Sequence, residues 1–385
     1  MQTVYLDNSS TTKPFDKVVE RVSSVMTTHY GNPSSVHKLG VEAEKIINEA
    51  KEILAGAVKA KPSELVFTSG GTESNNLAIK GIARKYRKKG RHIITSVIEH
   101  RSVLNTMKGL EEDGFEITYL PVDETGKIVP EQLREAMGED TILVSIMHAN
   151  NETGVIQPMD EISNILIRQK SKPVFHVDAV QSFGKLPLAL YNSDIDMLTV
   201  SSHKVHGPKG VGALYLREGI NVDPLLLGGG QEEGRRSGTE NMPGIAGFAE
   251  AISLIYENRE KKVEEIKRLR DGLANKIQEK IPAVKINTPL ENSVPHILNI
   301  SFPGLKGEVL LRSLESEGIY VSTSSACNSR KKKASHVLNA MGLTNSELEG
   351  AIRISLSVLN NKEEMDYCFD KLMPVFKRLK KMGNL

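Results

Sequence analysis

Three short motifs place groups that could bind an anion, a cation and a carbonyl directly after apolar segments. SGGTE (residues 69–73) follows the apolar ELVFT, Asp178 follows HV in HVDAVQ, and Lys204 lies in SSHKVHGPKG (residues 201–210). Glycine lets the backbone approach an anion closely, and a helix N-terminus offers it unpaired N–H groups. A carboxylate in a dry pocket requires a cationic partner. Desolvation lowers the pKa of a lysine, as a Schiff-base amine requires.

Each motif alone also has an ordinary structural explanation. SGGTE could be a turn capped by Thr72, Asp178 could pair with an arginine, and Lys204 could extend into solvent. Together, a phosphate cradle, an acid and a lysine 26 residues later are what pyridoxal phosphate (PLP) needs: a held phosphate, a protonated ring nitrogen and a tethered aldehyde. His100 begins a predicted helix just beyond a strand, where its ring could stack on the cofactor or lie on the surface.

The segments around these motifs predict strands that alternate with helices. Strands are expected at residues 64–68, 92–96, 116–122, 141–148, 174–177 and 197–201, and helices at 73–88, 102–112, 130–137 and 159–169. This order predicts an α/β fold with a mainly parallel central sheet flanked by helices. In such sheets ligands bind beyond the carboxyl ends of the strands.

The pattern changes after residue 240. A long, charged helical segment covers residues 240–281 with a break expected near Asn258, and strand-like and helical segments follow in looser order. We therefore expect a smaller α+β domain made of residues 1–14 and 259–385, beside a large PLP-binding domain of residues 15–258.

The overall composition excludes several classes of protein. Hydrophobic residues make up 39% of 385, which suffices for a globular core, and 50 Lys+Arg against 48 Asp+Glu do not fit an obligate nucleic-acid binder. Two cysteines fit a reducing compartment, and the sequence shows neither a signal peptide nor an apolar run of about 18 residues. We expect a cytoplasmic protein that does not bind membranes. Gly228–Gly230 do not have the spacing of an NAD-binding fingerprint.

The sequence resembles the cysteine desulfurase family of fold-type I PLP enzymes, which share the fold of aspartate aminotransferase, and within it the long-loop subgroup. The resemblance covers nearly the whole chain. It rests on LDNSSTT (6–12), YGNPSSVH (30–37), FTSGGTESNNLA (67–78), HANNETGVIQP (148–158), HVDAVQSFGKLP (176–187), SSHKVHGPKGVGALY (201–215), RRSGTENMPG (235–244) and ACNS (326–329).

The resemblance implies a role for each matching residue. Lys204 would carry the cofactor covalently, Asp178 would pair with its ring nitrogen, and His100 would stack on the ring and assist proton transfer. Arg353 would bind the substrate carboxylate through two N–H groups, assisted by Asn32. Further cofactor contacts would come from Asn151 and Gln181 at the ring oxygen, from Gly71, Thr72, Ser201 and His203 at the phosphate, and from Thr239, which would reach the phosphate of the other subunit in an obligate homodimer.

The two cysteines differ in their surroundings. Cys327 lies in STSSACNS (322–329), a run of small residues that predicts an exposed loop, and RKKK (330–333) follows it. Nearby cations lower the pKa of a thiol, although this run could equally be a solvated helix start. Its three lysines replace the small and acidic residues expected in the family, which leaves the partner open. Cys368 lies on an amphipathic helical segment and is expected to pack in the core.

We therefore expect a PLP-dependent cysteine desulfurase that converts L-cysteine to L-alanine and leaves a persulfide on Cys327. No metal is required, although Cys327 could be a transient ligand of an iron–sulfur cluster. The sulfur would pass to an iron–sulfur scaffold protein or a tRNA-thiolation protein, without direct binding of nucleic acid. The alternatives are another PLP activity on the same fold, such as a selenocysteine lyase or an aminotransferase, and a non-catalytic sulfur-transfer subunit.

Overall fold

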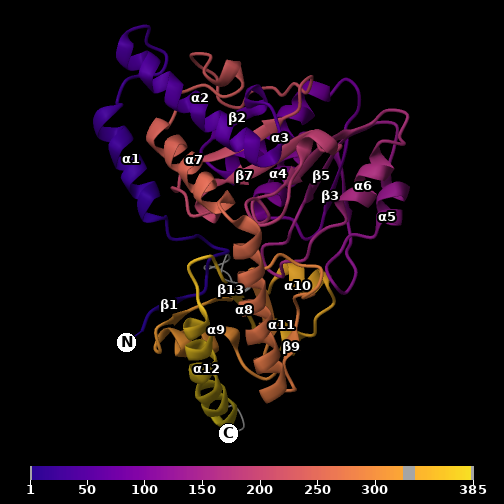
Figure 1. Ribbon diagram of the computed structural model, residues 1–385. Helices are drawn as coiled ribbons and strands as arrows, with labels where there is room; N and C mark the ends of the chain where they lie inside the picture. The colour runs from indigo at the N-terminus through magenta and orange to yellow at the C-terminus, as the bar shows by residue number, and fades with distance from the viewer. Residues whose placement is uncertain (1, 324–333, 383–385) are drawn as a thin grey trace.

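The computed structural model describes residues 2–323 and 334–382, which form a larger and a smaller part (Figure 1). The larger part contains a central sheet with helices packed around it. The smaller part contains the first strand and most of the C-terminal third of the chain, so that the described segments nearest both ends lie in it (Figure 1). None of the described helices is long and apolar enough to cross a membrane.

The central sheet has seven strands in the order β2-β8-β7-β6-β5-β3-β4. Neighbours from β7 to β4 pair in parallel, whereas β8 runs antiparallel to both β2 and β7. Every residue of β5, β6, β7 and β8 is buried, as expected for strands covered on both faces. The predicted mainly parallel sheet is confirmed. The strands are β2 (Leu65–Thr68), β3 (His92–Ser96), β4 (Glu116–Leu120), β5 (Thr141–Met147), β6 (Val174–Asp178), β7 (Met197–Ser201) and β8 (Gly212–Leu216).

Helices cover this sheet. Both α1 and α2 pack against α7, which is apolar nearly all round and mostly buried, while α3 packs on the sheet beside α4. A short 3-10 turn, η3 (Ser202–Lys204), follows β7 directly. The helices of the larger part are α1 (Asp16–Thr28), α2 (Lys38–Val58), α3 (Gly71–Tyr86), α4 (Arg101–Glu112), α5 (Pro130–Ala136), α6 (Met159–Leu166) and α7 (Met242–Tyr256), with 3-10 turns η1 (Pro62–Glu64), η2 (Leu190–Asn192) and η4 (Glu232–Gly234).

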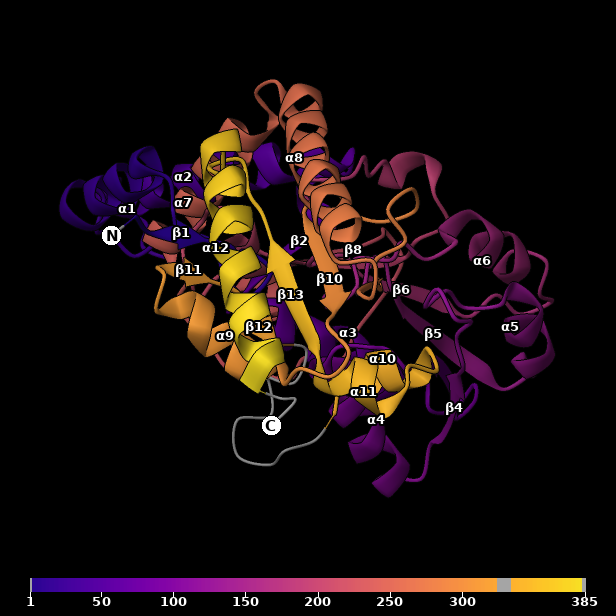
Figure 2. The same cartoon turned by 90° about the horizontal axis from the view of Figure 1, so that it is seen from below.

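The smaller part is built on an antiparallel sheet in the order β12-β13-β10-β9, and β1 pairs in parallel with β11. Seen from below, α8 and α12 run beside β10 and β13 (Figure 2). The elements are β1 (Val4–Tyr5), α8 (Arg259–Lys280), β9 (Lys285–Ile286), β10 (Ile297–Ser301), α9 (Gly307–Glu315), β11 (Ile319–Tyr320), β12 (Ser322–Thr323), α10 (His336–Ala340), α11 (Asn345–Glu349), β13 (Ala351–Ser355) and α12 (Lys362–Met382).

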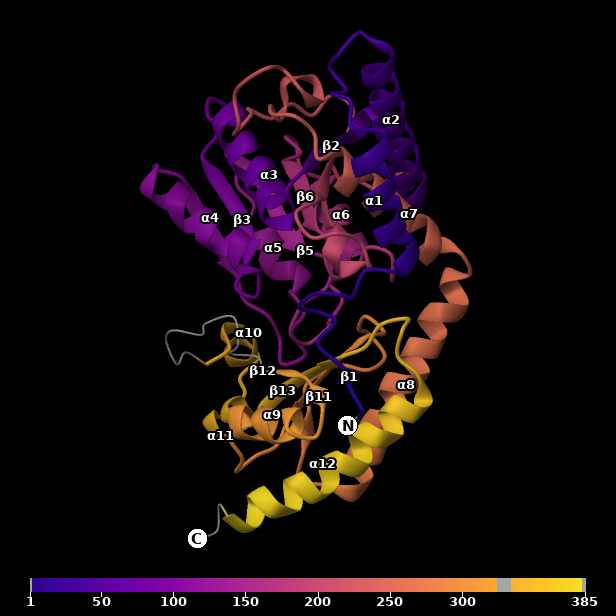
Figure 3. The same cartoon turned by 90° about the vertical axis from the view of Figure 1, so that its left-hand side faces the viewer.

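Helix α8 connects the two parts (Figure 3). The expected break at Asn258 is confirmed, because this residue has the left-handed conformation (φ 56°) between α7 and α8. One buried apolar cluster joins Val4 and Leu6 to residues between 266 and 375, whereas two other clusters draw only on residues between 25 and 252. On this packing we propose the division into residues 15–258 and residues 1–14 with 259–385.

Candidate active site

A cavity of about 290 Å³ lies at the carboxyl ends of the parallel strands. Residues directly after β2, β3, β5, β6 and β7 line it, as do residues of the N-terminal segment and of β13. Because the carboxyl ends of parallel strands meet at one edge of a sheet, groups that are far apart in the chain converge there. The lining residues are Ser9, Ser10, Gly71, Thr72, Asn75, His100, Ser102, Met147, Ala149, Asn151, Asp178, Val180, Gln181, Ser201, His203, Lys204 and Arg353.

Asp178 is the last residue of β6, and its carboxylate is buried in the wall of this cavity. Its Oδ2 accepts a hydrogen bond of 2.8 Å from Nδ2 of Asn75, and its Oδ1 accepts one of 3.0 Å from the backbone N–H of Val180. Asn75 itself is held because its Nδ2 also donates to the hydroxyl of Ser102. These bonds fix the orientation of the carboxylate, which leaves it able to bind a cation in the cavity.

Lys204 ends the turn η3, and its amine lies against the N-terminal segment. Its Nζ donates to the backbone carbonyls of Ser9 (2.5 Å) and Ser10 (2.8 Å). A second lysine lies beneath it: Nζ of Lys185 donates to the carbonyl of Lys204 at 3.0 Å. Burial, followed by the nearby charge of Lys204, lowers the pKa of Lys185 to about 7. The amine of Lys204 therefore belongs to the lining of this cavity, whereas Lys185 lies behind it and lines a different pocket.

His100 caps the N-terminus of α4, with its ring facing the cavity. Its Nδ1 accepts a hydrogen bond from the backbone N–H of Ser102, so the neutral ring carries its proton on Nε2. The surrounding protein lowers the pKa of His100 by desolvation, and the charge of Asp178 partly opposes this shift. A neutral imidazole therefore faces the cavity at neutral pH. The carboxyl of the preceding residue, Glu99, is fully buried, and desolvation raises its pKa to about 8.

The start of α3 forms an anion cradle. A Cβ on Gly71 would lie 2.9 Å from Cγ2 of Val180, so only glycine fits where the helix begins. The first N–H groups of a helix have no partner within the helix, and the helix dipole adds positive potential there. Across from them, the hydroxyl oxygen of Ser201 is buried and has no hydrogen-bond partner among residues 2–323 and 334–382. Thr72 and His203 complete this end of the cavity.

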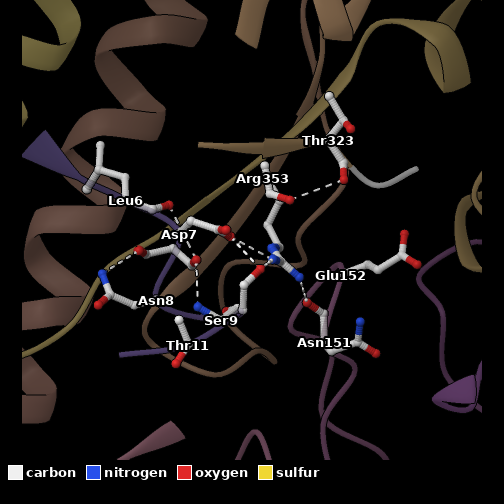
Figure 4. Close-up of polar contacts among 12 residues, drawn as sticks. Leu6, Asp7, Asn8, Ser9, Thr11, Asn151, Glu152, Thr323 and Arg353 are labelled. Carbon is white, nitrogen blue, oxygen red and sulfur yellow. Dashed lines mark hydrogen bonds and ion pairs between the residues drawn. The ribbon is translucent and has the colours of Figure 1, made fainter. Parts of the chain in front are cut away.

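Arg353 extends from β13 into the same cavity (Figure 4). Its Nη1 donates to the carbonyl of Asn151 at 2.7 Å, and its Nη2 donates to Oδ1 of Asp7 at 2.8 Å and to the hydroxyl of Ser10 at 2.7 Å. Within the described part of the chain its buried Nε has no partner. The guanidinium is thus fixed in position and keeps N–H groups that could bind a carboxylate.

Most of the residues predicted from the sequence converge on this cavity, but two of the described ones do not, and a third lies outside the described residues. Asn32 lies in the connection between α1 and α2, and Thr239 lies in a neighbouring pocket beside Phe67 and Asn241, so neither lines the cavity of this single chain. Cys327 lies outside the described residues. The roles assigned to these three residues stay predictions. Of the others, Gln181 is held between the carbonyl of Ser9 and His296 at the cavity wall.

Sequence reasoning missed several residues that shape the site. Asn75 lies one helical turn after Gly71, so helical periodicity from the anion cradle could have found it. Asp7, Ser9 and Ser10 lie in the LDNSSTT motif, but no spacing within the chain links that motif to β13. Glu99 directly precedes His100, and nothing in its sequence context signals that its carboxyl is buried.

The residues at this cavity fit PLP. The orphaned hydroxyl of Ser201 and the cradle at Gly71 suit a phosphate, the buried carboxylate of Asp178 suits a protonated ring nitrogen, and the amine of Lys204 suits an aldehyde. The three groups surround one cavity, and the imidazole of His100 faces the same space. Each functional part of the cofactor therefore has a chemically matched group.

Comparison with known proteins gives consistent results. The aminotransferase class-V family matches residues 4–368. A relative named cysteine desulfurase IscS, from Dictyoglomus turgidum (strain DSM 6724 / Z-1310), is 45% identical over 98% of this chain and 95% of its own. A solved structure described as a NifS-like protein covers 98% of this chain and 100% of its own, with a TM-score of 0.93 and 42% identity. Another, described as SspA in complex with cysteine, covers 93% and 100%, with a TM-score of 0.82 and 37% identity.

Proposed function

The chain belongs to the aminotransferase class-V family and is a cysteine desulfurase within it, and from this premise we propose that it binds PLP in the cavity described above and transfers the sulfur of L-cysteine to Cys327. The family is PLP-dependent. When bound, PLP withdraws electrons from the substrate α-carbon and so makes its proton acidic. The observation that carries the proposal is that Asp178, Lys204 and the anion cradle at Gly71 line one cavity.

Each group in the cavity has a separate task in this proposal. The N-terminus of α3, Thr72, Ser201 and His203 hold the phosphate, and Asp178 holds the protonated ring nitrogen. Arg353 binds the α-carboxylate of L-cysteine, which orients the α-carbon toward Lys204 in the same cavity. Asn151 and Gln181 also line the cavity and would contact the ring oxygen. Binding by these groups is what fixes the substrate for proton transfer.

Lys204 and His100 take part in proton transfer. The Nζ of Lys204 removes the α-proton of the substrate, for which it must be unprotonated. Desolvation lowers the pKa of His100, so its ring is neutral and its Nε2–H can donate a hydrogen bond that orients the groups between which the proton moves. The buried amine of Lys185 lies behind Lys204, where burial and the charge of Lys204 lower the pKa of Lys185 to about 7.

The thiolate of Cys327 completes the reaction by attacking the substrate sulfur. The carbon–sulfur bond of the substrate breaks, a sulfur–sulfur bond forms at Cys327, and the electron pair left on carbon takes up a proton. L-Cysteine and one thiol thus become L-alanine and one persulfide. The other cysteine does not suit this role, because burial in α12 raises the pKa of the Cys368 thiol to about 12.

The persulfide must pass its sulfur on for a second turnover. We propose as acceptor an iron–sulfur scaffold protein or a tRNA-thiolation protein, with Cys327 as a transient cluster ligand in the first case. We propose the cytoplasm as the place of this transfer, because a chain with only two cysteines fits a reducing compartment. The assembly we propose is a homodimer in which Thr239 reaches the partner's phosphate. Thr239 is exposed, and the large side chains of Tyr30 (70%), Val36 (99%) and Leu227 (84%) are also exposed on the larger part.

The test is the release of L-alanine from L-cysteine by the purified protein in the presence of a reductant. We expect the wild type and a Cys368→Ala variant to release alanine, and a Cys327→Ser variant to release none. The Cys368→Ala variant is the matched control, since it also removes one thiol. Equal release by all three proteins would refute persulfide formation at Cys327. A PLP-containing protein that releases no alanine would refute the reaction while keeping the cofactor.

The oligomeric state is tested separately by light scattering coupled to size-exclusion chromatography. We expect a mass of two chains for the wild type and weaker retention of PLP in a Thr239→Ala variant of the same mass. A monomer that retains PLP would refute the shared phosphate site.

A further inference from the structure

The carboxylate-binding arginine of the proposed site already holds a carboxylate from its own chain. Arg353 and Asp7 form an ion pair with 2.8 Å between Nη2 and Oδ1, and the two side chains are 8% and 23% exposed. The residues are 346 positions apart in the sequence. Figure 4 shows the Asp7 carboxylate against the guanidinium, on the side opposite the carbonyl of Asn151. A buried guanidinium with one partner carboxylate is largely neutralised.

The position of Asp7 is fixed by several hydrogen bonds. The hydroxyl of Ser10 donates to Oδ1 of Asp7 at 2.8 Å and also accepts from Nη2 of Arg353, which closes a three-membered network. The backbone is held next to β13, because the N–H of Asn8 donates to the carbonyl of Ser355 and the N–H of Ser9 donates to its hydroxyl. The Asp7 carboxylate is therefore a built part of the arginine site.

The segment that carries Asp7 also contacts the reacting amine. Ser9 and Ser10, two and three residues after Asp7, accept the hydrogen bonds from Nζ of Lys204. A ligand that binds between Arg353 and Lys204 must therefore lie against this segment, and its carboxylate must approach the guanidinium next to Asp7.

We propose that Asp7 competes with the α-carboxylate of substrate and product for Arg353 and so sets how strongly the site binds carboxylates. This inference rests on the proposed role of Arg353. Two carboxylates against one guanidinium repel each other, so Asp7 weakens the binding of every carboxylate ligand. Acetate, L-cysteine and L-alanine share this penalty, so weak carboxylate ligands such as acetate occupy the site less. The product L-alanine is released more readily for the same reason.

The experiment compares carboxylate binding by the wild type and by Asp7→Asn, which keeps the size and the oxygen acceptor but removes the charge. Dissociation constants for acetate and L-alanine are measured by NMR titration of the purified PLP-loaded protein. We expect Asp7→Asn to bind both about tenfold more tightly, within the range of typical coupling energies, and to show a lower KM for L-cysteine with slower release of alanine. Asp16→Asn, at an exposed position in the first turn of α1, is the charge-matched control and should bind as the wild type does.

A double variant separates competition from a merely structural role, and a second substitution of Asp7 is available as a replacement. In an Arg353→Ala background, Asp7→Asn should no longer tighten acetate binding, because the competition requires the guanidinium. Asp7→Ser serves in the same assay if Asp7→Asn does not fold. Wild-type or weaker acetate binding by a folded Asp7 variant would overturn the inference. Failure of the wild type to release alanine would instead refute the proposed function, while the acetate measurement would still test competition at Arg353.

Discussion

The buried carboxyl of Glu99 makes the stability of the protein depend on pH in a predictable direction. Its Oε1 accepts hydrogen bonds from the hydroxyl of Ser96 (2.6 Å) and the N–H of Met147 (2.9 Å), and its Oε2 has no partner among the described residues. Desolvation is the largest cause that raises its pKa from 4.5 to about 8, and the charge of Asp178 adds to it. The folded protein therefore holds a proton here that the unfolded chain releases above pH 4.5.

The sign of the effect follows from proton binding. Where only the folded state binds the proton, the free energy of unfolding falls as pH rises, by about 1.4 kcal/mol per pH unit. Stability contributed by neutral Glu99 is complete below pH 4.5 and is lost as pH rises toward about 8. Over the interval from pH 5.5 to 7.5 the loss from this one group is about 3 kcal/mol.

A Glu99→Gln variant isolates this contribution. Its amide oxygen accepts the same two hydrogen bonds, and its amide nitrogen introduces unpaired N–H groups at a cost of about 1–3 kcal/mol that does not depend on pH. We expect the free energy of unfolding of the variant, relative to that of the wild type, to rise by about 1.4 kcal/mol per unit between pH 5.5 and 7.5 and to level off above pH 8.

The assay is urea denaturation of both proteins, with equal PLP content, at half-unit steps of pH. Taking the difference between the two proteins cancels the other buried titrating groups, which both share. A difference that stays constant over this interval would show that Glu99 is ionised in the folded protein and would refute the reasoning.

Three further predictions concern single side chains. A Gly71→Ala variant should lose bound PLP at least tenfold faster than the wild type in dialysis, about the effect of a small displacement of a binding group. The reason is that the added Cβ would lie 2.9 Å from Cγ2 of Val180 and would move the start of α3. An unchanged rate of loss would show that the cradle can adjust. Iodoacetamide at pH 8 should leave Cys368 unmodified in the folded protein by mass spectrometry, since its pKa is raised to about 12 by burial; rapid modification would contradict that burial. Burial lowers the pKa of Lys185 from 10.5 to about 7. The free energy of unfolding of the wild type, relative to that of Lys185→Met, should therefore rise by about 1.4 kcal/mol per pH unit between pH 7.5 and 9.5, which is opposite in sign to the effect of Glu99. A difference that does not change with pH would mean that the amine stays charged in the folded protein.

The sequence was sufficient to predict the part of the site that lies at strand ends. Asp178, Lys204 and the start of α3 each follow a strand whose apolar pattern is visible, and parallel pairing brings such positions together. The antiparallel strand β8 was not predicted, although GALYL is apolar, because it follows the glycine-rich turn of the lysine motif. Helices α1 and α2 were also not predicted.

The remaining features depend on contacts that no local pattern contains. The ion pair between Asp7 and Arg353 joins residues 346 positions apart. The neutral state of Glu99 depends on complete burial by elements packed around it. Asn32 and Thr239 do not line the cavity of one chain, so no contact within this chain tests their assignment as site residues.

The N-terminal segment explains how the two parts of the molecule form one site. Arg353 belongs to β13 of the smaller part, whereas Lys204 follows β7 of the larger part. Asp7 and Ser10 bind the guanidinium, the carbonyls of Ser9 and Ser10 bind the amine, and Thr12 donates from both its N–H and its hydroxyl to the carbonyl of His203. Displacement of Asp7 by a substrate carboxylate would therefore also disturb the segment that holds the amine of Lys204. The segment from Asp7 to Ser10 therefore contacts both the guanidinium and the reacting amine, because it lies between the two parts.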